Sequence, residues 1–236
     1  TLGNLINLRN FYVKTNRLSG PFPVVLTKLV KLEYLNLSFN NFSGVIPAEI
    51  GNWEELKHLY LWKNQFSGSI PPSIGKLRNL TELSLGENRL SGELPKELGQ
   101  LENLVTAYLN NNAFTGQIPN EMTRASNLKY LNLNSNKITG TFPPSIGKMK
   151  RLKFLSVFWN KMSGTLPSEL GELENLEWLY LTNNRFSGTL PSSISNLKRL
   201  KILAIPNNTF SSFPEELGDL ESLEELNASS AFSGGR

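Results

Sequence analysis

Aromatic side chains recur at a regular spacing in this chain, and their types indicate a binding function. The sequence holds 13 Phe, six Tyr and four Trp, and Tyr34, Tyr130 and Trp178 are separated by multiples of 24 residues. Exposed Trp and Tyr are enriched at binding hot spots, because they bury a large apolar area and still carry a hydrogen-bonding group. The candidate partner-binding residues are Tyr34, His58, Tyr60, Trp62, Tyr108, Tyr130, Phe154, Phe158, Trp159, Trp178 and Tyr180.

Catalytic chemistry lacks the residues it needs. His58 is the only His, so a His-based catalytic triad or a His-rich metal site is not available. The chain has no Cys, which excludes disulfides and a Cys-based metal site. Ser, Asp and Glu are abundant, but none of them suggests a paired nucleophile and base. We therefore expect no enzymatic activity, no cofactor and no metal.

An Asn that recurs every 24 residues shows how these side chains are positioned. It occupies the same phase at Asn16, Asn40, Asn64, Asn88, Asn112, Asn136, Asn160, Asn184 and Asn208. A fixed period of this length predicts a solenoid, in which each unit buries its apolar edge only against its neighbours. The Asn amide both donates and accepts hydrogen bonds, so it can satisfy backbone groups of its own turn and of the adjacent one. We interpret the column as a structural Asn ladder.

The residues around each ladder Asn predict the rest of the unit. Leu residues three and five positions before it, such as Leu35 and Leu37, alternate with variable residues, as in a strand with one buried face. A Gly four positions after it, such as Gly44, is expected to have a positive φ. The Pro that follows, such as Pro47, begins a return run that we expect to form short 3-10 or helical turns.

Segments such as Asn40 to Pro47, Asn64 to Pro71 and Asn184 to Pro191 closely resemble the plant-type leucine-rich repeat. The resemblance implies an α/β repeat solenoid of about ten 24-residue repeats. In that family the chain forms a right-handed superhelix, with a parallel β-sheet on the concave face, a short second strand at the Ser-Gly-x-Ile-Pro segment, and 3-10 turns on the convex face. The resemblance also implies a relation to the ectodomains of receptor-like kinases and receptor-like proteins, which recognise peptides and proteins.

The repeat covers the whole chain, so we predict a single leucine-rich repeat array over residues 1–236. The chain begins at Thr1 to Leu8 with the return half of a repeat, which leaves the N-terminus uncapped, and its last repeat, 223–236, is degenerate. The family usually carries paired Cys in its caps, and this chain has none. We expect it to be a fragment of a longer protein. No stretch is long enough to span a bilayer, so we expect no direct membrane insertion by this segment.

On the concave face we expect two aromatic clusters separated by a polar saddle. The N-terminal cluster contains Tyr34, Phe39, His58, Tyr60 and Trp62. The C-terminal cluster contains Phe154, Phe158, Trp159, Trp178 and Tyr180, and the saddle contains Ser84, Gly86, Asn110, Asn132 and Asn134. Cross-strand stacking that only stabilises the sheet is the alternative interpretation. The net charge of +4 is spread through the repeats, so we expect no nucleic-acid partner.

Two functions follow from these observations. The first is a recognition module that holds a peptide or protein ligand on the concave face, alone or with a co-receptor, outside the cell or at its surface. The second is a scaffolding subunit of a larger assembly, possible in an intracellular or organellar compartment because the chain needs no disulfides. Candidate N-glycosylation positions for the first are Asn41, Asn79 and Asn207. Asn36 also lies in such a triplet, but a glycan there would obstruct the N-terminal cluster.

Overall fold

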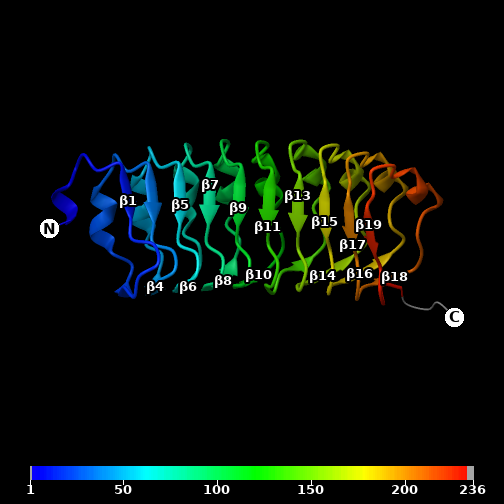
Figure 1. The fold of residues 1–236 in the computed structure, drawn as a ribbon, viewed down its shortest axis with the longest axis horizontal. Coiled ribbons are helices and arrows are strands. Elements are labelled where there is room, and N and C mark those ends of the chain that lie inside the picture. Colours follow the sequence, from blue (N-terminus) through cyan, green and yellow to red (C-terminus); the bar gives the residue numbers. More distant parts are fainter. Residues whose placement is uncertain (1, 233–236) are drawn as a thin grey trace.

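The fold is an elongated array of stacked coils. A computed structural model of the chain describes residues 2–232. Figure 1 shows the strands of the main sheet side by side along the long axis, from β1 at one end to β19 near the other. Within residues 2–232 this concave sheet has ten parallel strands, in sequence order. They are β1 (Asn10–Tyr12), β3 (Tyr34–Asn36), β5 (His58–Tyr60), β7 (Glu82–Ser84), β9 (Thr106–Tyr108), β11 (Tyr130–Asn132), β13 (Phe154–Ser156), β15 (Trp178–Tyr180), β17 (Ile202–Ala204) and β19 (Glu225–Asn227).

A second set of short strands forms what we call the lateral face. The strands are β2 (Ser19–Pro21), β4 (Asn41–Val45), β6 (Gln65–Gly68), β8 (Arg89–Glu93), β10 (Ala113–Thr115), β12 (Thr139–Gly140), β14 (Lys161–Gly164), β16 (Arg185–Gly188) and β18 (Thr209–Phe210). They pair in parallel from β2 to β10 and from β12 to β18. The Thr139 N–H donates to the Gly116 carbonyl at 2.7 Å, so backbone hydrogen bonding continues across the gap. Except for β2 and β12, these strands begin directly after the ladder Asn, slightly earlier than the Ser-Gly-x-Ile-Pro segment indicated.

The return half of each coil is a 3-10 turn, as expected. The turns are η1 (Leu2–Asn4), η2 (Val24–Lys28), η3 (Ala48–Asn52), η4 (Pro72–Lys76), η5 (Lys96–Gln100), η6 (Asn120–Arg124), η7 (Pro144–Lys148), η8 (Ser168–Glu172), η9 (Ser192–Asn196) and η10 (Glu215–Asp219). Pro47 fixes φ at −73° before η3, and its carbonyl accepts from the Ile50 N–H at 3.2 Å. Five residues suffice for such a tight turn but are too few for a stable α-helix.

The core lies between the concave sheet and the 3-10 turns. Leu35, Leu37 and their equivalents in most coils are fully buried. Phe residues two positions after the ladder Asn stack from coil to coil, with ring centroids 6.2 Å apart for Phe42 and Phe66. Trp53 is also buried, and its indole N–H donates to the Leu26 carbonyl at 3.1 Å. Because identical layers repeat, each coil completes the core of its neighbour.

Each ladder Asn connects adjacent coils by hydrogen bonds. The Asn64 Oδ1 accepts from the Phe42 N–H at 3.0 Å. Its Nδ2 donates to the carbonyls of Leu37 and Leu61 at 3.0 and 3.1 Å. One amide therefore satisfies backbone groups of its own turn and of the preceding coil. A second Asn column on the return half was not foreseen: Asn79, Asn103, Asn127 and Asn175 donate to carbonyls of the preceding coil at 2.7–2.9 Å.

Two turns per coil use the left-handed backbone region. The expected one lies at the Gly four positions after the ladder Asn, with φ of 75° at Gly44. The other lies at the residue before the ladder Asn, with φ of 52–59° at Thr15, Phe39, Lys63, Glu87, Asn111, Ser135, Trp159, Asn183 and Asn207. Large side chains adopt this conformation only at a cost in strain.

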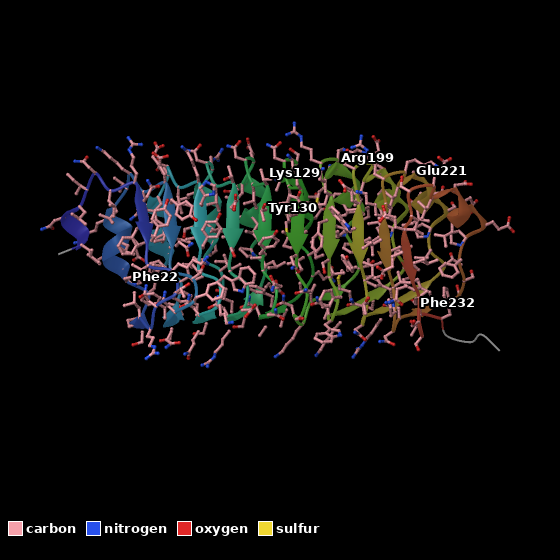
Figure 2. All side chains as sticks on the ribbon, viewed as in Figure 1. Phe22, Lys129, Tyr130, Arg199, Glu221 and Phe232 are labelled. Carbon is pink, nitrogen blue, oxygen red and sulfur yellow. The ribbon has the colours of Figure 1, made fainter. Side chains whose placement is uncertain are left out.

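The two ends of the array are less enclosed than its middle. Leu5, Ile6 and Leu18 in the first coil are 49%, 60% and 43% exposed. At the other end, the Phe232 ring packs edge-on against Phe213 at 4.6 Å. Figure 2 places Phe22 and Phe232 near opposite ends of the array. Thr1 and the end of the degenerate last repeat, 233–236, lie outside the described residues.

Candidate functional site

The concave strands present two outward columns of side chains. Each strand has three residues, and its middle residue points into the core, so the first and third point out. The strands pair in register, which aligns Tyr34 with His58 and Glu82, and Asn36 with Tyr60 and Ser84. Tyr130 lies in the outward column near the middle of the sheet (Figure 2). The column formed by the third residue of each strand contains Tyr side chains separated by smaller ones. This alternation decides which of the smaller side chains are covered.

The N-terminal aromatic residues form a continuous layer. The Tyr34 ring lies 4.5 Å from Tyr12, 5.2 Å from His58 and 5.2 Å from Tyr60. The side chains of Tyr34, His58 and Tyr60 are half-buried. The cross-strand stacking that the sequence left as an alternative therefore describes this part of the face.

A carboxylate organises the edge of that layer. The Tyr60 hydroxyl donates to a Glu82 carboxylate oxygen, and the His58 Nδ1 lies 3.7 Å from the other oxygen of Glu82. Partial burial raises the pKa of Tyr60 well above its usual value, and the hydrogen bond to Glu82 raises it further. Partial burial also raises the pKa values of Tyr108 and Tyr180.

Alkaline titration should separate these phenols from the others. A Tyr whose pKa is raised on folding contributes stability that is fully present below the unfolded pKa of about 10 and is lost as the pH rises through the folded pKa. We expect near-ultraviolet phenolate absorbance to show Tyr60, Tyr108 and Tyr180 ionising last, together with unfolding. Tyr60→Phe should remove the last phenol to titrate. A single transition of all Tyr near pH 10 in the folded chain would contradict the burial.

A hollow of about 550 Å³ lies in the middle of the concave face. It is lined by Trp62, Tyr108, Asn110, Tyr130, Asn132, Phe154, Trp178 and Tyr180. Trp62 and Tyr108 have ring centroids 6.5 Å apart, and Phe154 and Tyr180 have theirs 5.6 Å apart. We call this site the aromatic hollow. It joins members of both expected clusters through Tyr108 and Tyr130, so the two clusters are not separate.

The expected polar saddle is mostly covered. Ser84 is 2% exposed, Asn110 is 7% exposed and Gly86 is buried, although all three were expected on the exposed concave face. Ser84 lies in register between Tyr60 and Tyr108, and these larger side chains cover it. The absence of a side chain at Gly86 leaves room for Asn110, since a Cβ there would lie 2.8 Å from the Asn110 Oδ1. The amides of Asn110 and Asn132 therefore line the hollow, and the saddle does not form an exposed polar ridge.

The hollow is neutral, and charged residues lie beside it. The Glu177 carboxylate accepts from Lys153 at 3.1 Å and from Lys201 at 3.2 Å. The hydrogen bond from Lys153 is the main cause that lowers the pKa of Glu177. Lys201 also places its ammonium 5.6 Å from the centre of the Trp178 ring. This contact holds one wall of the hollow by a cation–π interaction.

Six of the residues expected in the two clusters do not line the hollow: Tyr34, Phe39, His58, Tyr60, Phe158 and Trp159. Phe39 and Trp159 occupy the left-handed turn after their strands, with φ of 57° and 54°. Trp159 is 60% exposed and packs edge-on against Phe158 at 5.9 Å. Neither of them lines the hollow, but the Phe39 ring lies 6.2 Å from the ring of Trp62, which does. A role of Phe39 and Trp159 in the binding face stays a prediction.

The candidate glycosylation residues differ in their surroundings. Asn41, Asn79 and Asn207 are exposed. The Asn79 Nδ2 donates to the Glu54 carbonyl at 2.9 Å, and the Asn207 Nδ2 donates to Asn183 Oδ1 at 2.7 Å. Asn36 is 8% exposed and its Oδ1 accepts from the Ser38 N–H at 3.0 Å, so a glycan cannot be attached there without disturbing the sheet. Asn41 is the least constrained of the candidates.

Comparison with protein-family models identifies the class. The leucine-rich repeat region model matches residues 145–234, and two leucine-rich repeat models match residues 6–66, 79–101 and 127–149. The chain belongs to the leucine-rich repeat family, and its repeats are of the plant type. No helix within residues 2–232 is long and apolar enough to cross a lipid bilayer. Comparison with curated proteins found no match.

Several solved structures that are similar to this chain are plant receptors. The plant peptide hormone receptor RGFR1, in complex with RGF2, is 32% identical with a TM-score of 0.88 over 97% of this chain. The Arabidopsis receptor kinase HAESA, in complex with the peptide hormone IDA and the co-receptor SERK1, is 34% identical with a TM-score of 0.87 over 96% of this chain. A Leptospira interrogans leucine-rich repeat protein is 30% identical with a TM-score of 0.76 over 97% of this chain, which covers 68% of it. This chain spans only 40% of the RGFR1 chain and 42% of the HAESA chain.

Proposed function

We propose that this chain is an extracellular recognition module whose aromatic hollow binds a peptide or a short segment of a protein. The observation that carries the proposal is a neutral hollow of about 550 Å³, walled by six aromatic rings and holding the amides of Asn110 and Asn132. Binding sites of this kind bury apolar ligand groups, while a few polar groups fix their orientation. The named complexes of RGFR1 and HAESA with peptide hormones support the same class of ligand.

The chemistry of the hollow describes the part of the ligand that it accepts. No charged side chain lines it, so a buried carboxylate or ammonium would be desolvated without a partner. An apolar or aromatic side chain fits the rings, and a backbone amide or hydroxyl can bond to the Asn amides or the Tyr hydroxyls. Charged residues of the ligand are expected beside the hollow, where Glu82, Lys153, Glu177 and Lys201 lie. The proposed site excludes Phe39 and Trp159.

Peptides selected from a random display library against the chain provide the test. Trp62→Ala and Trp178→Ala should each weaken binding of a selected peptide by more than about 1 kcal/mol, because each removes one wall of the hollow. The measurement is calorimetric titration of the purified variants. Trp159→Ala is the matched control, since it removes an exposed Trp outside the hollow and should leave the affinity unchanged. Equal affinities for the wild type and both hollow variants would reject the hollow as the site.

We also propose that the chain is a secreted or cell-surface glycoprotein. The exposed Asn41, Asn79 and Asn207 triplets support glycosylation, and the plant receptor neighbours support the location. The intact mass of the protein from its native source should exceed the 26.4 kDa of this chain and fall after enzymatic removal of N-glycans. Asn41→Gln should lower the glycan mass more than Asn207→Gln does, because the amide of Asn207 is hydrogen-bonded to Asn183. A mass unchanged by deglycosylation would favour the scaffolding function instead.

A further inference from the structure

The positive charge of the chain is concentrated on the lateral face. We count this face from the residue before each ladder Asn to six residues after it. It holds six of the 24 Lys and Arg residues but only two of the 20 acidic residues. The rest of the chain, with 18 basic and 18 acidic residues, is neutral. The basic residues responsible for the net charge come from many repeats, as expected, but they lie on one surface.

In the C-terminal half of this face, all of the charged residues are cations. Across 111–118, 135–142, 159–166, 183–190 and 207–214, the charged residues are Lys137, Lys161 and Arg185. All three are exposed, and none takes part in an ion pair within residues 2–232. Toward the N-terminus the first carboxylate is Glu93. Three unpaired cations in three successive coils make a line of positive potential with no nearby compensation.

The strand register places a hydroxyl beside each of two cations. Lys161 at the start of β14 pairs with Thr139 in β12, and Arg185 at the start of β16 pairs with Ser163 in β14. Paired residues of parallel strands project to the same side of the sheet, and these four side chains are exposed. The unit that repeats from coil to coil is therefore a cation next to a hydroxyl.

An exposed aromatic ring borders this line. Trp159 is 60% exposed two residues before Lys161, in a left-handed turn where other coils carry Asn111, Asn183 and Asn207. Asn tolerates this conformation more readily than other side chains, whereas Trp is strained in it. Phe39, Lys63 and Glu87 adopt the same conformation in other coils, so the strain does not single out Trp159. Its exposed apolar face can pack against the C–H face of a sugar ring.

We propose that Lys137, Lys161, Arg185 and Trp159 form a binding site for a linear acidic polysaccharide of uronic acid residues. Such a polymer repeats a carboxylate beside hydroxyl groups, which is the complement of a cation beside a hydroxyl in successive coils. The carboxylates pair with the two Lys ammoniums and the Arg guanidinium, the latter able to bind in a bidentate geometry. The sugar hydroxyls bond to Thr139 and Ser163, and one sugar ring stacks on Trp159. The site would hold the protein to an acidic carbohydrate matrix and leave the aromatic hollow free.

Other polyanions fit this surface less well. An anionic membrane would prefer exposed apolar side chains among the cations. In the three coils that carry the cations, Trp159 is the only exposed large apolar side chain, and the exposed Leu18, Phe39, Val45 and Phe213 lie in other coils. A nucleic acid strand would prefer several stacking rings along the line. An acidic protein segment would need apolar anchors, which the exposed hydroxyl column does not provide. Hydroxyls alternating with cations favour a carbohydrate.

The test measures binding of the whole chain to oligogalacturonates of increasing length at low salt. The triple variant K137Q/K161Q/R185Q should lose affinity by about tenfold or more, because three charge-assisted contacts are removed. Its matched control, K28Q/K76Q/K148Q, removes the same charge from exposed Lys residues on the 3-10 turns and should bind like the wild type. Wild-type binding should weaken steeply as salt is added. Trp159→Asn should lower affinity without loss of stability, since Asn relieves the strained turn.

Three further probes decide the class of ligand. Methyl-esterified polygalacturonate keeps the sugars without the charge and should bind weakly. Vesicles containing anionic phospholipid and single-stranded DNA should also bind weakly. Equal binding of either one, lost in the same triple variant, would make this a general polyanion surface and overturn the proposal. Failure to bind oligogalacturonate at low salt, or equal loss in both triple variants, would overturn it as well.

Discussion

Replacing Asn184 with Ala is expected to lower the free energy of unfolding by about 3 kcal/mol, because several buried backbone groups lose their partner. Asn184 is 8% exposed. Its Oδ1 accepts from the Met162 N–H at 3.0 Å, and its Nδ2 donates to the Val157 and Leu181 carbonyls at 2.9 and 3.1 Å. These groups belong to two coils, so the change leaves unsatisfied polar groups on both sides of one junction. Chemical denaturation of the purified variant measures the loss.

Asn16→Ala is the matched control for this substitution. Asn16 occupies the same phase in an exposed turn, and its amide donates only to the Val13 and Lys14 carbonyls of its own coil, at 3.0 and 3.2 Å. Water can replace those bonds, so the cost should be about 0.5–1 kcal/mol. Hydrogen exchange should show the protection lost in Asn184→Ala around β14 and β16. Equal destabilisation by both variants would show that the ladder bonds between coils contribute little.

The fold was predictable because its main constraints repeat at a fixed phase. A Leu column with a period of two defines each concave strand, and the Gly four positions after the ladder Asn has the positive φ that its type indicates. The left-handed residue before the ladder Asn was missed. Its types include Phe39, Lys63, Glu87 and Trp159, and none of these indicates such a turn. The conformation is imposed by the coil geometry and not by the residue that adopts it.

The site was only partly predictable, because exposure depends on neighbours that lie 24 residues away. The sequence shows that Ser84 and Ser156 point out of the sheet, but not that large flanking side chains cover them. It also shows that Tyr108 and Tyr130 are outward, but not that they close a hollow with Trp62 and Trp178. Period analysis assigns the side of a strand, and packing between coils then decides which side chains a ligand can reach.

The two proposed sites use different properties of the same repeat. The aromatic hollow depends on residues at the concave strand positions, while the cation line depends on the residue directly after the ladder Asn. Neither position contributes to the core, so both vary without harm to the solenoid. A variant of one site should therefore leave the other unchanged, and this independence can be checked by measuring peptide binding in K137Q/K161Q/R185Q and oligogalacturonate binding in Trp178→Ala.

Gly99→Ala is the second substitution with a large expected effect. A Cβ at Gly99 would lie 2.0 Å from the backbone oxygen of Glu121 and 2.5 Å from its carbonyl carbon. Those atoms belong to η6, the 3-10 turn of the next coil, so relief requires two packed coils to separate. We expect the free energy of unfolding to fall by about 2–3 kcal/mol, as in other overpacked sites. Chemical denaturation, compared with the wild type, measures the change.

Gly218→Ala is its matched control, because Gly218 holds the same place in η10 that Gly99 holds in η5. A Cβ there would meet nothing within 4 Å, so the variant should be as stable as the wild type or slightly more stable. Thr123 shows that this phase can accept a side chain where the next coil leaves room. It is 2% exposed, and its hydroxyl bonds to the Asn120 carbonyl at 2.7 Å and to Ser145 Oγ at 2.9 Å. If Gly99→Ala proved as stable as Gly218→Ala, the spacing of coils would adapt freely, and close stacking at this phase would not limit the array.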